Sequence, residues 1–422
     1  MEENERVANW DQNDPLRAFR DEFHFPKALN GHECVYLTGN SLGLQPVAAE
    51  RYVREELEDW QQFGVEGHVH ARRPWVNYHS LFPESLGKIV GAKKEEVVAM
   101  NGLTANLHFL MVSFFRPEGK RKKLLIEAKA FPSDLYALRS QLRYHGLGEE
   151  DLILIQNREG EDHIRTEDIL KIIDAHGEEI AMSMMGGVNY YSGQFFDMAS
   201  ITSALKNAGA MVGWDLAHAA GNVPMKLHEW GVDCAAWCSY KYLNSGPGNV
   251  SGVFIHEKHH GKTDIPRFEG WWGHDESSRF AMPEHFVPMP TADAWQLSNA
   301  PVLGMAAHRA ALDIFDRTDM QTLREKSIRL TAYLEEILLE LGLRFNTGWR
   351  ILSPKDPAQR GCQLSLFVPE RGKSLFDFLK THNVIADWRE PDVIRMAPAP
   401  LYNSFADLYR LKKIMIDFYE KS

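Results

Sequence analysis

Short apolar runs alternate with stretches of helical periodicity between residues 96 and 257, and this alternation restricts the possible folds more than any other feature. The strand-like runs are 96–100 (EVVAM), 122–130 (KKLLIEAKA), 151–156 (DLILIQ), 179–188 (EIAMSMMGGV), 210–215 (AMVGWD) and 250–257 (VSGVFIHE). Strands separated by helices form parallel βαβ units, so the pattern predicts an α/β fold with a mostly parallel, doubly wound sheet. Ligands of such sheets bind at the carboxyl ends of the strands.

The pattern changes after about residue 300, where long helical stretches precede one strand-like run and a further helix. These segments are 301–315, 321–342, 362–369 and 373–383. We expect a large α/β domain at 61–300 and a smaller α+β domain at 301–422. The N-terminal segment, 1–60, is expected to join the smaller domain.

Charge and cysteine content exclude several classes of protein. The 47 Lys and Arg against 58 Asp and Glu give a net charge of −11, so neither nucleic acid nor an anionic membrane is an expected partner. The N-terminus lacks the basic start and apolar stretch of a signal peptide, and no apolar run reaches membrane-spanning length. Four cysteines are too few for a disulfide framework, so we expect reduced thiols in a cytoplasmic protein.

Two of the strand-like runs are followed by polar residues that open a helix. Leu103 and Thr104 follow the first run, where backbone N–H groups and a hydroxyl could bind a phosphate; an ordinary helix cap is the alternative. After the second run come Phe131, Pro132, Ser133 and Asp134. Phe131 could present a ring face to a ligand, while the same residues also suit a proline turn and a cap.

Asp215 ends another apolar run, and His218 lies three residues further on. A carboxylate in such surroundings needs a cationic or hydrogen-bonding partner. A metal pair is one alternative, but no further ligand set has suitable spacing, and HEKHH (256–260) has the composition of a solvated loop. We therefore expect no metal site.

Lys241 stands in WCSYKYLNSGPG (237–248), between two tyrosines and after an apolar stretch. Desolvation lowers the pKa of a lysine and leaves the free amine that a Schiff base requires, although a lysine can also extend out of a core. A phosphate site, a flat ring, a buried aspartate and this lysine are the four parts that pyridoxal phosphate needs.

The chain resembles the kynureninases, which are fold-type I pyridoxal phosphate enzymes related to the class V aminotransferases. The resemblance extends over almost the whole chain. Its motifs are YLTGNSLGLQP (36–46), GHVHARRPW (67–75), MNGLTANLHFLMVSFF (100–115), EAKAFPSDLYALRSQL (127–142), 214–248 (WDLAHAAG through KYLNSGPG), GWWGH (270–274), LSNAPVL (297–303) and RMAPAPLYNSF (395–405).

The resemblance implies roles for individual residues. Lys241 would hold pyridoxal 5′-phosphate as a Schiff base, and Tyr240 would contact the phosphate and relay protons. Arg395 would bind the substrate α-carboxylate, a task that suits a guanidinium fork. The implied remainder of the cofactor shell is Leu103, Thr104, residues 131–134, Asp215, His218 and, from the second subunit of a homodimer, Trp271 and Asn299.

The implied reaction is hydrolysis of the Cβ–Cγ bond of kynurenine to anthranilate and L-alanine, in tryptophan catabolism or NAD biosynthesis. His68 and the pair Ser298–Asn299 resemble members of the family that accept 3-hydroxykynurenine, so we expect activity on that substrate; a purely structural His68 is the alternative. Gly186 departs from the family, because some relatives have a serine near the cofactor at this position.

Other activities fit the same features less well. A cysteine desulfurase needs a mobile cysteine, whereas Cys362 lies in a strand-like run, and an aminotransferase would transfer its amino group to keto acids. A dimeric binding protein without activity would lack a working lysine or arginine at 241 and 395. A metal hydrolase would be colourless and sensitive to chelators.

Overall fold

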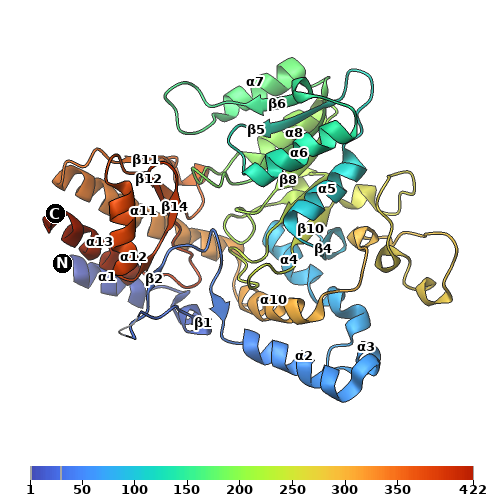
Figure 1. Cartoon of the computed structure of the whole chain (residues 1–422), viewed down its shortest axis with the longest axis horizontal. Helices are drawn as coiled ribbons and strands as arrows, with labels where there is room; N and C mark the ends of the chain where they lie inside the picture. Colours follow the sequence, from blue (N-terminus) through green and yellow to red (C-terminus); the bar gives the residue numbers. More distant parts are fainter. Residues whose placement is uncertain (1, 29–30, 422) are drawn as a thin grey trace.

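The computed structural model describes residues 2–28 and 31–421. Figure 1 shows a large sheet with helices on both faces and, beside it, a smaller sheet next to which both termini lie. None of the helices in the described ranges has the length and hydropathy needed to cross a membrane.

The large sheet has seven strands in the order β4-β10-β9-β8-β7-β5-β6. Five of them, from β9 to β6, run parallel, which confirms the expected mostly parallel α/β fold. The strands are β4 (Val97–Ala99), β5 (Lys123–Glu127), β6 (Leu152–Ile155), β7 (Ile180–Gly186), β8 (Met211–Asp215), β9 (Cys234–Trp237) and β10 (Gly252–Ile255).

Two features of this sheet differ from the expected pattern. β9 was not recognised as a strand, because its four residues lie in a longer apolar stretch with no turn signal of its own. β10 runs antiparallel to β4 and β9. A parallel strand needs a crossover connection. The segment 238–251 between β9 and β10 contains no helix, so the chain returns in the opposite direction.

Each face of the large sheet packs against its own layer of helices. Side chains alternate along a strand, so Leu124 and Ile126 of β5 join the core under α5 and α6, while Leu125 joins the core under α7 and α8. The helices of the large sheet are α4 (Pro83–Val90), α5 (Leu103–Phe114), α6 (Pro132–Tyr144), α7 (Thr166–His176), α8 (Met198–Asn207) and α9 (Leu227–Trp230).

The small sheet is antiparallel, with the strand order β11-β12-β15-β14. Its strands are β11 (Arg350–Ile351), β12 (Leu364–Phe367), β14 (Asp387–Arg389) and β15 (Val393–Met396), and its helices are α11 (Met320–Arg344), α12 (Gly372–Thr381) and α13 (Phe405–Glu420).

The N-terminal part of the chain contributes to both regions. Val7 of α1 (Glu3–Gln12) and Val35 of β2 (Val35–Tyr36) are buried in the core that α11 and α13 form, and β2 pairs with β13 (Val384–Ile385). By contrast, α2 (Ala49–Phe63) packs against α10 (Val302–Phe315), away from the small sheet (Figure 1). The remaining elements are β1 (Phe23–His24), β3 (Gln45–Pro46) and α3 (Gly67–His70).

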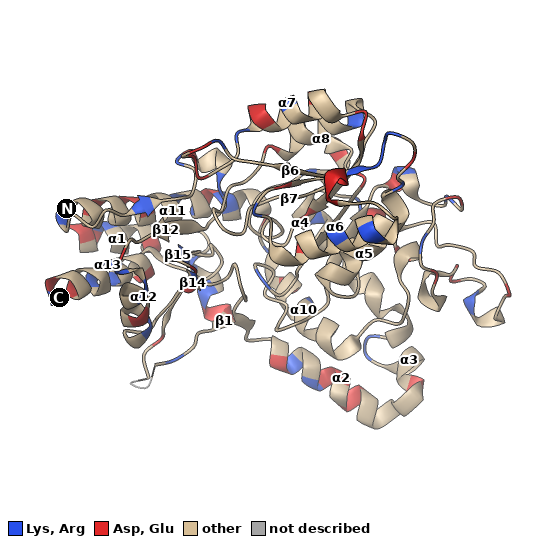
Figure 2. Ribbon diagram, turned by 45° about the horizontal axis from the view of Figure 1, so that its top comes forward, with Lys and Arg blue, Asp and Glu red and all other residues tan. Residues whose placement is uncertain are grey.

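Basic and acidic residues both occur along the elements drawn in Figure 2. Along α2, arginines and acidic residues are interspersed. In each of the α2 ion pairs Arg51–Glu55 and Arg54–Glu50, the two partners are four residues, or about one helical turn, apart.

Candidate active site

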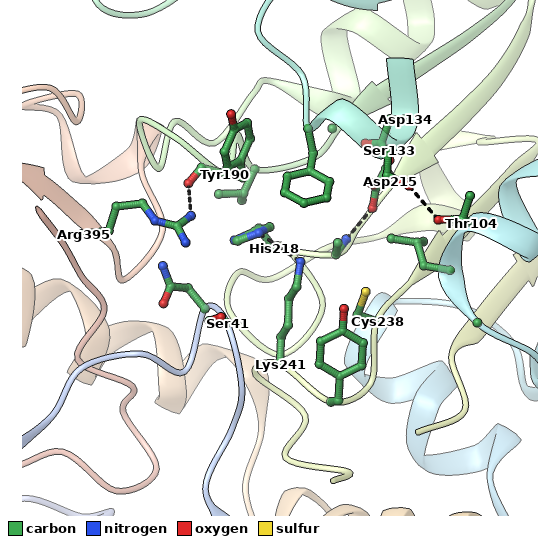
Figure 3. A pocket seen from close by; sticks show the side chains of 18 of the residues that line it. Ser41, Thr104, Ser133, Asp134, Tyr190, Asp215, His218, Cys238, Lys241 and Arg395 are labelled. Carbon is green, nitrogen blue, oxygen red and sulfur yellow. Dashed lines mark hydrogen bonds between the residues drawn. The ribbon is translucent and has the colours of Figure 1, made fainter. Parts of the chain in front are cut away.

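A cavity of about 380 Å³ lies at the carboxyl ends of β5, β7 and β8. Its wall combines the strand ends with the start of α5, the segment after β9, the N-terminal turn at Asn40 and Ser41, and the small sheet. Figure 3 shows Arg395 and Ser41 at one end, Thr104 and Ser133 at the other, and Lys241 with His218 between them. The position agrees with the general placement of ligands in open α/β sheets.

Lys241 lies in the segment that follows β9 and extends into this cavity. Its Nζ lies 3.1 Å from His218 Nε2 and 5.9 Å from the centre of the Phe131 ring. Burial and the neighbouring Lys241 hold the pKa of His218 well below its usual range, so the imidazole is neutral and its Nε2 accepts a hydrogen bond from the amine. His218 Nδ1 is then a buried donor with no partner in the described part of the chain.

Three carboxyl groups line the cavity beside this amine. Asp215, the last residue of β8, accepts a hydrogen bond from the backbone N–H of Ala217 at 2.7 Å. Burial, then repulsion by Asp215, raises the pKa of Asp134 well above its usual range, and burial raises the pKa of Glu127 to about 8. Burial thus favours the protonated forms of Asp134 and Glu127, and with them a cluster of lower charge than three carboxylates would have.

Two helices begin at the far end of the cavity. Leu103, Thr104 and Ala105 open α5, where the first backbone N–H groups have no partner within the helix. Thr104 Oγ1 lies 2.8 Å from Ser133 Oγ, in the first turn of α6, and Pro132 at the start of α6 fits because that position needs no N–H. Free N–H groups, two hydroxyls and the positive ends of two helix dipoles suit an anion.

At the opposite end, Arg395 extends from β15. Its Nη1 donates to the backbone oxygen of Tyr190 at 2.6 Å, and its Nη2 pairs with Asp387. Arg389 also pairs with Asp387, at 3.1 Å, and lines the same cavity. Burial lowers the pKa of Arg395 to about 10, so the guanidinium stays charged at neutral pH. The cavity therefore offers a cationic group at the end opposite the anion site.

The structure also brings in residues that the sequence did not single out. Tyr190, Arg389 and Glu127 line the cavity together with Asn40 and Cys238. Glu127 had a signal of its own, because a carboxylate at the end of an apolar strand needs an explanation. The other residues lie on loops or in the small sheet, where the sequence alone does not show that they reach the strand ends.

Five residues expected at the site do not line the cavity of a single chain: His68, Pro132, Trp271, Ser298 and Asn299. His68 Nδ1 lies 2.9 Å from the backbone oxygen of Val65, and its ring meets Trp75 edge to face. Trp271 is 43% exposed, and Ser298 and Asn299 are exposed. Their roles toward a ligand stay predictions, as does the arrival of Trp271 and Asn299 from a second subunit.

One other group of the described residues brings metal-type ligand atoms together: Glu96, His228 and His256, within 4.8 Å of one another. Glu96 already accepts hydrogen bonds from His228 Nδ1 at 2.9 Å and from the backbone N–H groups of Glu257 and Lys93.

The expectation of a solvated loop at 256–260 is wrong for His259, which is buried and bonds to Asp233 at 2.8 Å. An apolar neighbour, Phe114, packs against His259 and favours this burial.

Two family models match the chain. The model described as "Aminotransferase class-V" matches residues 53–362, and the model described as "Kynureninase C-terminal domain" matches residues 323–415.

Similar proteins come from bacteria and an animal. The chain is 55% identical to a kynureninase of Christiangramia forsetii over 96% of its own length and 95% of the relative. It is 54% identical to a kynureninase of Myxococcus xanthus, with 96% and 95% covered, and 47% identical to one of Nematostella vectensis, with 95% and 90% covered.

Solved structures of low sequence identity share the fold. A cysteine desulfurase from Thermococcus onnurineus superposes with a TM-score of 0.74 at 16% identity, covering 98% of each chain. A cysteine desulfurase from Escherichia coli gives a TM-score of 0.75 at 16% identity, covering 96% of this chain and 98% of that one.

Proposed function

The chain belongs to the kynureninase family, and we propose that it hydrolyses the Cβ–Cγ bond of L-kynurenine or 3-hydroxy-L-kynurenine, releasing L-alanine and the aromatic acid. Such a hydrolase serves tryptophan catabolism. The observation that carries the proposal is the position of Lys241 between the anion site at the start of α5 and the buried guanidinium of Arg395.

The cavity fits pyridoxal phosphate, the cofactor of this family. The start of α5, with Thr104 and Ser133, would hold the phosphate, and Asp215 would pair with the ring nitrogen. The orphaned buried atoms Asp134 Oδ1 and His218 Nδ1 are an acceptor and a donor that a polar ring can satisfy. Lys241 would bind the aldehyde carbon covalently, and Phe131 would cover a face of the ring. When bound, the cofactor supplies an electron sink for the pairs released from Cα–H and Cβ–Cγ.

The residues of the chain then divide the remaining work. Arg395 binds the α-carboxylate of the substrate and fixes the direction of the Cα–H bond. The Nζ of Lys241 takes the Cα proton, and the neutral Nε2 of His218 keeps the amine in place. Burial raises the pKa of Tyr240, so its phenol remains protonated and holds the proton that Cβ receives after water has added to Cγ.

A desulfurase activity is disfavoured by the cysteines. Cys362 is fully buried and burial raises its pKa to about 12, so it is neither mobile nor ionised. Cys238 lines the cavity, but burial raises its pKa as well. A thiol must be ionised to act as a nucleophile.

We propose further that the working form is a homodimer in which Trp271 and Asn299 enter the partner's site, and that His68 and Ser298 contact the substrate ring. The exposure of Trp271, Ser298 and Asn299 in one chain supports this arrangement. The four buried, unpaired cysteines support a reducing, cytoplasmic location. The division into parts 1–60, 61–300 and 301–422 also stays a proposal.

The test begins with the purified chain and added pyridoxal phosphate. A yellow absorbance band that borohydride removes is expected, followed by release of alanine when kynurenine is added. Comparison of kcat/KM for kynurenine and 3-hydroxykynurenine then identifies the preferred substrate. The Lys241→Ala variant should lose both the band and turnover; full turnover in that variant would refute the role of Lys241.

A further inference from the structure

Glu127 and Asp215 end two strands of the large sheet that are separated by only one other. The strand between them, β7, ends at Gly186, which is in register with Asp215. The backbone N–H of Gly186 lies 3.1 Å and 3.3 Å from the two carboxyl oxygens of Glu127. The carboxyl group of Glu127 thus reaches across the end of β5 to the end of β7, on the side from which the cavity opens.

The absence of a side chain at position 186 makes this arrangement possible. A Cβ atom added to Gly186 would lie 2.8 Å from Glu127 Oε1, closer than a carbon and an oxygen can approach without a shift. Glu127 is buried, and its carboxyl end lies between Gly186 and the cavity that it lines. Its carboxyl group therefore takes up the space that a side chain at position 186 would need.

Glu127 has no ion-pair partner among the residues that the structure describes, although Lys241 lines the same cavity. The groups that act on it are the backbone N–H groups of Gly186 and of Glu127 itself and, from β8, the carboxylate of Asp215; Asp134 of α6 faces the same cluster. No Lys or Arg among residues 2–28 and 31–421 forms an ion pair with it, whereas other buried carboxylates such as Asp233 have lysine partners. Burial beside Asp215 without an ion-pair partner favours the protonated form of a carboxyl group.

We infer that Glu127 is a positioning residue for Asp215: its carboxyl group, lying over Gly186 between the ends of β5 and β8, is uncharged in the working enzyme and leaves the negative charge of the cluster on Asp215. The inference rests on the proposed function, because Asp215 matters as the partner of the cofactor's ring nitrogen. An ionised Glu127 would place a second negative charge near Asp215 and spread the attraction for the ring proton over two carboxylates.

The charge of Glu127 can be measured directly. Infrared difference spectra of the full chain at pH 6.5, wild type minus Glu127→Gln, should contain the carbonyl band of a protonated carboxylic acid. The band should decline as the pH is raised past the point at which Glu127 ionises. A purely structural Glu127 with an ionised carboxylate would give only carboxylate bands, and that result would overturn the inference.

The consequence for the cofactor is measured by titrating apoprotein with pyridoxal phosphate. Glu127→Gln keeps the shape and the neutral state, so its Kd should stay close to that of the wild type. Glu127→Ala leaves the Gly186 N–H without its partner, so its Kd should rise about tenfold. Gly186→Ala should weaken binding in the wild-type background but add little in Glu127→Ala, because the two side chains compete for one space.

The two proposals fail in different ways. A wild-type chain that binds no pyridoxal phosphate would refute the proposed function and the inference with it. A wild-type chain that binds the cofactor, while Glu127→Gln binds it as weakly as Glu127→Ala, would refute the inference alone, since the charge rather than the shape would then be needed. Independent effects of the Gly186 and Glu127 substitutions would also overturn it.

Discussion

At the scale of single residues, the site depends on acidic and basic side chains that are buried together. Arg395 brings positive charge into a cavity that also holds the Lys241 amine and three carboxyl groups, and His218 stays neutral between Lys241 and Arg395. Paired groups with environments that shift their pKa values apart are typical of sites that move protons. Substitutions of single residues can therefore test the charge and the hydrogen bonds of each group separately.

Arg395→Lys should lower kcat/KM for kynurenine by roughly tenfold to a hundredfold, because the ammonium keeps the charge but loses the two-pronged contact with a carboxylate. Steady-state kinetics at saturating cofactor measure the effect. The Kd for pyridoxal phosphate should stay near its wild-type value, which separates substrate binding from cofactor binding. An unchanged kcat/KM would contradict the assigned role.

Glu127→Gln should change how the stability of the apoprotein depends on pH. The folded pKa of about 8 lies above the reference value of 4.5, so the folded state holds an extra proton between these values. Stability from this group is therefore fully present below about pH 4.5 and is lost as the pH rises toward 8. As the pH rises across this interval, the free energy of unfolding of the wild type should fall relative to that of the variant by on the order of 4 kcal/mol.

Urea unfolding at a fixed protein concentration, at several values between pH 5 and pH 8.5, measures this difference. The buried imidazole of His308, which Glu127→Gln leaves in place, titrates equally in both proteins and cancels in the comparison. Parallel curves for the two proteins would mean that Glu127 has no raised pKa in the folded chain.

At the scale of elements, the sequence predicts the parallel strands and the helices between them, because each has a periodicity of its own. Asp215 could be predicted at a strand end for the same reason, whereas Lys241 could be predicted only after an apolar stretch, because β9 was not recognised as a strand. Glu127 was not predicted, although it ends β5, since its role depends on the neighbouring glycine of β7. The direction of β10 was not predicted either, because it follows from the connection after β9 rather than from the strand's own residues.

The residues of the small sheet show the same limit. Arg395 was assigned by resemblance. Asp387 and Arg389 lie on the neighbouring strand, where Asp387 pairs with both arginines, and neither residue carries a sequence signal. A contact between two domains of a chain depends on how they dock. Composition and periodicity describe only the elements within each domain.

Glu96 joins three elements and should contribute strongly to stability. It is fully buried at the start of β4 and accepts hydrogen bonds from His228 of α9 and from the backbone at Glu257, after β10. Glu96→Ala should lower the free energy of unfolding by about 3–5 kcal/mol, because buried donors lose their acceptor. Chemical unfolding measures the loss.

Glu95→Ala is the matched control for this change. Glu95 is exposed, and its nearest ion-pair partner, Lys94, is 3.9 Å away, so its removal should leave stability almost unchanged. Equal effects of the two substitutions would contradict the assignment of Glu96 as a buried connection between β4, α9 and β10.

At the scale of the whole molecule, the two sheets and the N-terminal segment enclose the cavity from three sides. Ser41 arrives from the N-terminal turn, Arg395 from the small sheet and Lys241 from the large one (Figure 3). Relative movement of the sheets would therefore change the distance between the substrate's carboxylate site and the amine. In the proposed dimer, the exposed Trp271 of one chain would contact the site of its partner.

Mixed dimers test whether two chains share each site. Lys241→Ala and Trp271→Ala chains should each be inactive or nearly so as homodimers, although the second keeps its lysine. After the two proteins are mixed, unfolded and refolded together, half of the dimers are mixed, and one of their two sites combines Lys241 with the partner's intact tryptophan. Activity should then recover to about a quarter of the wild-type value.

Lys241→Ala mixed with Arg395→Ala is the control, because both of these residues line the cavity within one chain. Every mixed site that has Lys241 then lacks Arg395, so no recovery is expected. No recovery with Trp271→Ala would show that each chain builds its site alone, whereas recovery in the control would show that Lys241 and Arg395 of one site come from different chains.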